Sequence, residues 1–169
     1  MYADYEFYAA IYGNSTISAA DFSRLIWDAD RKLDKETTGV DGMRKLRVAF
    51  PTDEYSAEAV RRCACKLVNL AYAIESAEKS ASAANEYDIT DNGLRGKVIS
   101  SISSGSESIS YATSGIASTL IDKAVSDSAA RDKLYRDIIV EHLSGIQDAN
   151  GVNLLYMGPY PRGVFGIRV

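Results

Sequence analysis

Apolar residues recur every three or four positions along TISAADFSRLIWDADRKLDKETTG, which predicts an amphipathic helix. Ser18 is a good N-terminal cap, and Asp21 stands three residues later, as in a capping box. Ile17 and Phe22 occupy the two positions of a hydrophobic staple, and Gly39 ends the run. The predicted core stripe of this helix is Phe22, Leu25, Ile26, Ala29 and Leu33.

A second and longer helix is predicted after Pro51, with Thr52 as its cap. Its apolar stripe is the best core candidate in the chain, and it fades in the small and polar residues of ESAEKSASAANEYDITDNG. The members of the stripe are Val60, Cys63, Ala64, Leu67, Leu70, Ala71 and Ile74.

Two further helices are predicted in the second half of the chain. One contains Ile116, Leu120, Ala124 and Val125. The other lies in SDSAARDKLYRDIIVEHLSG, where Gly145 provides the stop. One face of this last helix is formed by Leu134, Tyr135, Ile138 and His142.

Between these helices, residues 96–113 form a Ser-rich segment of a different character. Residues 108–111 alternate with period two and Ser104-Gly105 provides a turn, so the segment is predicted to be a β-hairpin, or ribbon. A lone two-stranded hairpin is marginal in water. The ribbon therefore either lies on its own helices or packs against a neighbouring subunit. We favour the second alternative, in which the ribbon forms a contact between subunits. The residues proposed for this contact are Ile102, Ser104, Ile109 and Tyr111.

The C-terminal stretch is broken by glycine and by Pro159 and Pro161, and we expect it to be extended. Val164, Phe165 and Ile167 give it an apolar character, so it either pairs with its own domain or adds to an exposed edge of a partner. The predicted fold is mainly α: a compact helical bundle with a small β-hairpin projection and an extended C-terminal tail. The predicted division is a helical domain at 1–158 and a tail at 159–169.

Length, composition and charge narrow the function classes. The 169 residues suit one domain, and 46% hydrophobic with 25% charged residues is ordinary for a globular protein. Nothing approaches the run of about 20 apolar residues that spans a bilayer. The start, MYADYEFYAA, has two acids and no base, so we expect no signal peptide and no membrane partner. The net charge is −4, and the one dense basic cluster, Arg44-Lys45-Arg47, is expected to be a solvated face, which disfavours sequence-specific DNA binding.

Candidate chemistry is sparse. In a helix, Cys63 and Cys65 point roughly 200° apart, so neither a disulfide nor a shared metal is expected. His142 is the only histidine and has no evident partner for a catalytic triad or a zinc site. No phosphate-binding glycine loop is present. We therefore expect no enzymatic activity, no metal and no cofactor.

Four segments occur in an order that resembles the head–tail connector (adaptor) proteins of long-tailed bacteriophages: YADYEFYAAIYGN, ISAADFSRLIWDADRKLDKETTG, KVISSISSGSESISY and LLYMGPYPRG. Met157 departs from the Arg usual in that family, and a proline-containing tail extends the chain. The resemblance implies a structural virion protein of the neck, assembled in the host cytoplasm. It implies a dodecameric ring below the portal protein that lengthens the DNA channel and meets stopper or tail proteins.

By the same resemblance, the ribbon contributes to subunit contacts and the tail reaches into the portal. The tail residues proposed for portal binding are Pro161, Arg162, Val164, Phe165 and Ile167. An acidic ring would let genomic DNA pass without sticking. The alternative function is a cytosolic helical binding module for a peptide or small molecule. Concentration-dependent association favours the connector over the module.

Overall fold

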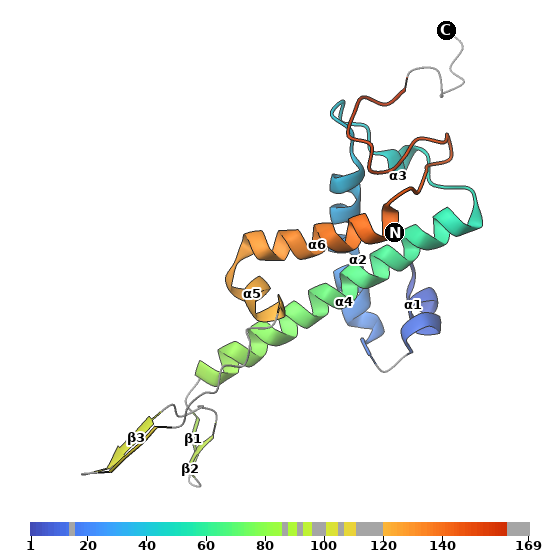
Figure 1. Ribbon diagram of the computed structural model, residues 1–169. Coiled ribbons are helices and arrows are strands. Elements are labelled where there is room, and N and C mark those ends of the chain that lie inside the picture. The colour runs from blue at the N-terminus through green and yellow to red at the C-terminus, as the bar shows by residue number, and fades with distance from the viewer. Residues whose placement is uncertain are drawn as a thin grey trace. The chain divides into compact units, whose positions relative to one another are not determined.

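The computed structural model describes residues 1–13, 16–85, 88–90, 93–95, 101–104, 107–110 and 120–161 (Figure 1), and side chains at 1–13, 16–79 and 120–161. The protein is mainly helical, as the sequence predicts. The helices are α1 (Tyr5–Tyr12), α2 (Ala19–Thr37), α3 (Lys45–Val48), α4 (Glu54–Asn85), α5 (Leu120–Ser126) and α6 (Ser128–Leu143).

Two short antiparallel strand pairs lie between α4 and α5 in the sequence. β1 (Asp88–Thr90) pairs with β2 (Gly93–Arg95), and β3 (Ser101–Ser104) pairs with β4 (Glu107–Ser110). Each pair is a sheet of its own. β3 and β4 fall within the Ser-rich segment, and the turn residues between them lie outside the described part of the chain.

The beginning of α2 is built as the sequence predicts. The Asp21 N–H donates to the Ser18 hydroxyl at 3.1 Å, and that hydroxyl donates to the Asp21 carboxylate at 2.7 Å. Ile17 and Phe22 are both buried, in keeping with a staple. The helix ends at Thr37, before the predicted Gly39. The whole predicted stripe is buried: Phe22, Leu25, Ile26, Ala29 and Leu33.

The aromatic start of the chain forms α1. Asp4 caps this helix by accepting the Phe7 N–H at 2.8 Å, and Gly13 follows it with a φ of 81°. Tyr8 is fully buried, with its ring centroid 5.0 Å from that of Phe22, and its hydroxyl donates to the Asn69 side chain at 2.6 Å. This one tyrosine therefore ties α1 to both α2 and α4.

The start of α4 corrects the predicted cap. The Ser56 N–H donates to the Asp53 carboxylate at 2.8 Å, so Asp53 rather than Thr52 caps the helix. Asp53 can do so because it stands at the position whose side chain reaches the third helical N–H. Of the predicted stripe, Val60, Cys63, Ala64, Leu67 and Ile74 are buried, while Leu70 and Ala71 are half-buried.

The core face of α6 also differs from the prediction. Its buried residues are Tyr135, Ile139 and Leu143, which are four residues apart. Leu134, Ile138 and His142, one position earlier, are only half-buried and flank this stripe. Gly145, with a φ of 80°, follows the helix as predicted.

The chain divides into two compact units, 1 (Met1–Tyr72 and Asp132–Val169) and 2 (Ala73–Arg131). In unit 1, α6 is tied to α2 by Arg136 Nε, 3.1 Å from the Glu36 carboxylate. In unit 2, Arg131 bonds the Glu78 carboxylate at 3.0 Å and carbonyls of the last turn of α5. No helix among the described residues is long and apolar enough to cross a bilayer.

Candidate functional site

The residues proposed for the ribbon contact are only partly within the described chain. Ile102 and Ile109 are directly opposite each other in the β3·β4 pair, and Ser104 is opposite Glu107. Tyr111 lies outside the described residues. Of the tail residues, Pro161 is exposed, and Arg162, Val164, Phe165 and Ile167 lie outside the described residues.

The chain just before Pro161 is firmly held. Tyr160 is buried, and its hydroxyl donates to the Asp148 carboxylate and accepts from the Asn150 side chain at 3.0 Å. Its backbone N–H donates to the Asp41 carboxylate at 2.7 Å. Burial and the bond to Asp148 raise the pKa of Tyr160. The packed chain therefore extends through Tyr160, two residues past the boundary predicted at 158.

Asp148 organises the turn that carries this contact. Its carboxylate also accepts the N–H groups of Asn150 and Val152, each at 2.9 Å, and Gly151 has a φ of 77°. This is the Asx type of turn, in which an aspartate side chain bonds its own following backbone. The tetrapeptide DANG at 148–151 is a sequence signal for such a turn, and sequence reasoning missed it.

Lys45 corrects the expectation that the basic cluster is solvated. The side chain is fully buried, and Nζ donates to the carbonyl oxygens of Thr37 (3.1 Å), Leu154 (3.2 Å) and Tyr156. Desolvation lowers the pKa of Lys45, an effect that the negative charges of Asp148 and Asp41 oppose. The ammonium group therefore joins the end of α2 to the C-terminal loop, 151–160.

Arg47 is also engaged within the chain. Its Nε donates to the Asp34 carboxylate at 2.8 Å, and the same carboxylate accepts the Tyr2 hydroxyl. The hydrogen bond to Asp34 raises the pKa of Arg47. Of the three basic residues, Lys45 and Arg47 thus serve internal contacts. The cluster does not form the continuous basic surface that duplex binding uses.

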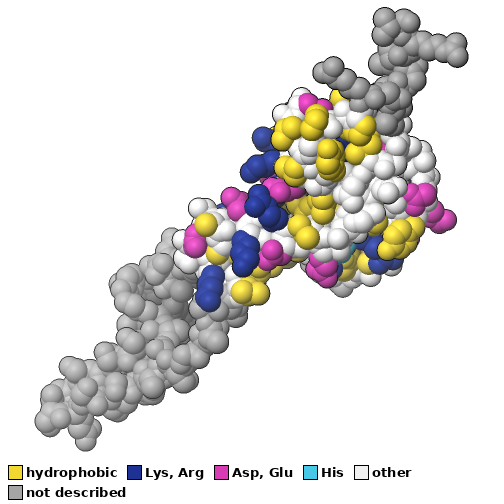
Figure 2. Space-filling model, turned by 45° about the horizontal axis from the view of Figure 1, so that its top comes forward, with side chains coloured by type: hydrophobic (Ala, Val, Ile, Leu, Met, Phe, Trp, Pro, Cys, Tyr) yellow, Lys and Arg dark blue, Asp and Glu magenta, His cyan; other side chains and the backbone are white. Residues whose placement is uncertain are grey.

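Beside the C-terminal loop lies an exposed apolar patch, formed by Val40, Tyr156 and Met157 and called here the loop patch. The Val40 N–H donates to the Met157 carbonyl at 3.1 Å, and the two side chains are 75% and 54% exposed. Figure 2 shows hydrophobic side chains gathered over the part of unit 1 where, in Figure 1, α3 and the C-terminal loop lie. Asp41, which binds the Tyr160 N–H, follows Val40 directly, so the chain enters the tail next to this patch.

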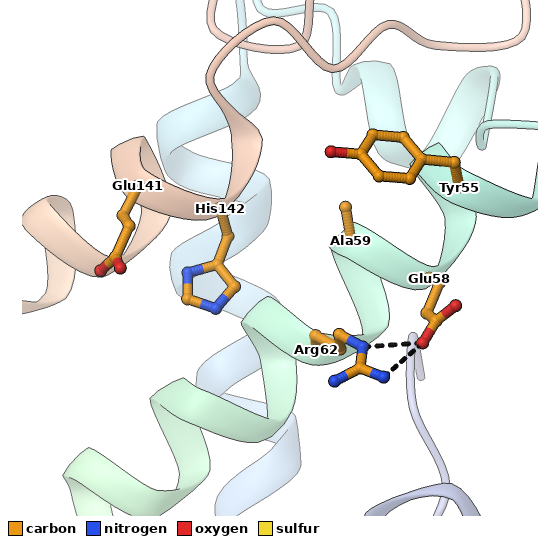
Figure 3. A pocket seen from close by; sticks show the side chains of 6 residues that line it. All are labelled: Tyr55, Glu58, Ala59, Arg62, Glu141 and His142. Atoms are coloured by element: carbon orange, nitrogen blue, oxygen red, sulfur yellow. Dashed lines mark hydrogen bonds and ion pairs between the residues drawn. The ribbon is translucent and has the colours of Figure 1, made fainter. Parts of the chain in front are cut away.

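A second feature is an open cavity of about 380 Å³ between α4 and α6 (Figure 3). Arg62 pairs with Glu58 at 2.6 Å along one wall, and Tyr55 is 78% exposed at the rim. His142 Nδ1 donates to the Ile138 carbonyl at 3.0 Å, which leaves Nε2 as the ring nitrogen able to accept. The lining residues are Tyr55, Glu58, Ala59, Arg62, Glu141 and His142.

The polar groups of the cavity lining are one histidine, one arginine, one tyrosine and two carboxylates. Glu141 directly precedes His142 on α6, and the lining contains no cysteine or serine. Within the described chain, no three His, Cys, Asp or Glu side chains gather as metal ligands would. Sequence reasoning missed the cavity because α4 and α6 are far apart in the sequence.

Comparison with protein-family models, with curated proteins and with solved structures gives no match to this chain.

Proposed function

We propose that the protein is a non-enzymatic head–tail connector of a long-tailed bacteriophage, assembled in the host cytoplasm and resident in the virion neck. In this role, copies form a ring below the portal protein. Genomic DNA passes through the ring, which makes no sequence-specific contacts with it. The upper side of the ring meets the portal, and the lower side meets stopper or tail proteins. The proposal requires neither cofactor nor membrane.

The observation that carries this proposal is the anchored base of the tail. Tyr160 is buried and bonded to Asp148 and Asp41, and Lys45 holds the preceding loop by two of its carbonyls. A peptide that leaves a domain from a fixed point loses less freedom when it binds than one that leaves from a loose loop. The exposed Val40 and Met157 beside that point offer additional apolar contact area. This arrangement supports a tail that docks on the portal.

The ribbon is proposed to project from the helices and to contribute to contacts between subunits. In the β3·β4 pair, Ile102 and Ile109 are cross-strand partners, and such apolar pairs are the units that stabilise a sheet surface. An isolated pair of strands is marginally stable in water, so contact with another subunit would stabilise it.

The test of the tail is deletion of Pro161–Val169. We expect the melting temperature to stay within about two degrees of the wild type, because Tyr160, the last buried side chain of the described residues, is retained. Binding to purified portal protein, measured by biolayer interferometry, should be lost. A matched deletion of Pro159–Val169, which also removes Tyr160, should lower the melting temperature clearly. Retention of portal binding by the shorter deletion would reject the tail as the portal contact.

The cavity between α4 and α6 favours one second candidate, a helical binding module for a peptide or small molecule. Sedimentation velocity separates the two functions. Self-association that increases with concentration supports the connector, whereas a monomer at every concentration supports the module.

A further inference from the structure

The exposed face of α2 carries an aromatic group with no place in the core. Trp27, the single tryptophan of the chain, is 61% exposed. The guanidinium carbon of Arg31, one turn later, lies 4.7 Å from the centre of the Trp27 ring. This stacking holds the indole against the helix surface. Trp and Arg are enriched among the residues that dominate binding energy at protein interfaces.

The exposed side chains around Trp27 carry a small excess of positive charge. Besides Arg31, the exposed residues on this side of α2 include Arg24, Asp28 and Lys35. Arg24 pairs with Asp21 at 3.5 Å, which leaves Arg31 and Lys35 against Asp28. The apolar stripe of α2 lies on the other side of the helix, while the buried Asp30 and Asp34, three and seven residues after Trp27, lie at the edge of the Trp27 face.

The cavity between α4 and α6 has complementary properties. Glu58 and Arg62 neutralise each other, which leaves Glu141 as the excess charge of the lining. Tyr55 at the rim and His142 in the wall present aromatic surface, and Ala59 leaves space between them, as Figure 3 shows. The volume of about 380 Å³ lies at the lower end of the range for pockets that hold small ligands, so one large aromatic side chain can enter.

Within one copy of the protein, Trp27 does not occupy the cavity. Trp27 is largely exposed and is not among the lining residues. In the view of Figure 3, α2 passes behind α4 and α6. The two complementary surfaces are therefore different parts of unit 1 and are available to two neighbouring copies.

We propose that the cavity of one copy receives the Trp27–Arg31 pair of a second copy. The indole packs against Tyr55 and His142 over Ala59, and Arg31 faces Glu141. Because the two surfaces differ, the contact is head-to-tail, and such a contact generates a closed ring when the rotation between copies allows it. The inference rests on the proposed ring function, because a head-to-tail ring needs two unlike surfaces on every subunit. Here these surfaces are the cavity and the Trp27–Arg31 pair.

Four variants test this contact by sedimentation velocity with light-scattering mass. Trp27→Ala removes the indole that enters the cavity, and Ala59→Arg fills the cavity and repels Arg31 of the second copy. Each should weaken self-association roughly tenfold or more while the circular dichroism spectrum stays unchanged. Val48→Ala and Leu120→Ala, which truncate exposed apolar side chains outside both surfaces, should assemble like the wild type.

An equimolar mixture of Trp27→Ala and Ala59→Arg gives the decisive reading. The intact Trp27 of the second variant fits the intact cavity of the first, and the remaining two surfaces are both disabled. The mixture should therefore form dimers and stop there, although each variant alone is monomeric. No merely structural effect of either substitution produces this rescue.

The outcomes separate the contact from the proposed function. Wild-type assembly that survives Trp27→Ala overturns the contact and leaves the connector function standing. Assembly that depends on Trp27, in a protein that does not bind purified portal, supports the contact and rejects the connector. A wild type that stays monomeric while free indole binds saturably in the cavity, detected by NMR shifts at His142, overturns the contact in favour of a small-molecule module.

Discussion

Lys45 is the residue that most closely couples the ends of the chain. Its ammonium group satisfies carbonyls from the last turn of α2 and from the C-terminal loop, separated by more than a hundred residues of sequence. A buried ammonium group is tolerated because each of its three protons has an acceptor. In turn, each of the three carbonyls accepts a hydrogen bond from the Lys45 ammonium group and loses that bond if the group is removed.

We predict that Lys45→Met lowers the free energy of unfolding by at least about 3 kcal/mol, since two buried carbonyl acceptors and one part-buried acceptor lose their donor. Urea denaturation followed by circular dichroism measures the change. Arg44→Met, at the exposed neighbouring position, is the matched control and should have little effect. Equal stability of the two variants would show that the loop rearranges at no cost.

The sequence could not predict the burial of Lys45. Its acceptors are backbone carbonyls, which carry no residue signature, and two of them are contributed by the far end of the chain. A cluster such as Arg44-Lys45-Arg47 is ordinarily solvated, and only the tertiary structure separates the roles of its members. Tyr160 was missed for a related reason, because its acceptor Asp148 is fixed by a turn rather than by a helix or strand period.

At the scale of elements, α2 was predicted most completely because its signals agree. The Ser18 cap, the Ile17–Phe22 staple and the apolar stripe all specify the same start and the same face. α4 shows the opposite case, since it continues to Asn85 after its apolar stripe is lost. Beyond Ile74 the helix contains four Ala, two Glu and one Lys, which favour helix by intrinsic propensity without an amphipathic pattern, among three Ser.

The cap of α2 gives a prediction at this scale. Ser18→Ala should reduce the free energy of unfolding by about 1 kcal/mol, because the Asp21 N–H loses its acceptor. Ser23→Ala, five residues later on the exposed side of the same helix, removes a similar hydroxyl from the helix interior and should not destabilise. Thermal unfolding of both variants by calorimetry makes the comparison, and an equal loss in both would argue against the capping role.

For the whole molecule, the helical class and the positions of the main helices followed from the sequence, whereas the closing of the C-terminal loop onto α2 and α3 did not. Loop 151–160 contains no regular element, so periodicity carries no information about it. The division into two units was likewise not predicted, because α4 runs through their boundary at Tyr72–Ala73 without any proline, glycine or change of element to mark it.

The attachment of that loop predicts a response to acid. The N–H groups of Tyr160 and Met43 stabilise the ionised Asp41 carboxylate and hold its pKa below the usual 3.8. The folded protein therefore binds this proton less readily than the unfolded chain. The contribution of Asp41 is complete well above pH 3.8 and is lost as the pH falls through the folded pKa.

We accordingly expect Asp41→Ala to be less stable than the wild type at neutral pH and to approach it as the pH falls below 3.8 and through the folded pKa, since the wild type loses the same interaction there. Urea unfolding at several pH values measures the difference. A gap between the two proteins that widens in acid would contradict the assignment.

The two cysteines on α4 have a practical consequence for all of these experiments. Cys63 and Cys65 are fully buried, and burial raises the pKa of each thiol to about 12. Alkylating reagents therefore meet almost no thiolate in the closed molecule at neutral pH. We therefore expect the native thiols to leave the label to one cysteine introduced at an exposed site, where a fluorophore can follow assembly. The slow rate at which Cys63 and Cys65 are labelled in the native protein then reports how often the core opens.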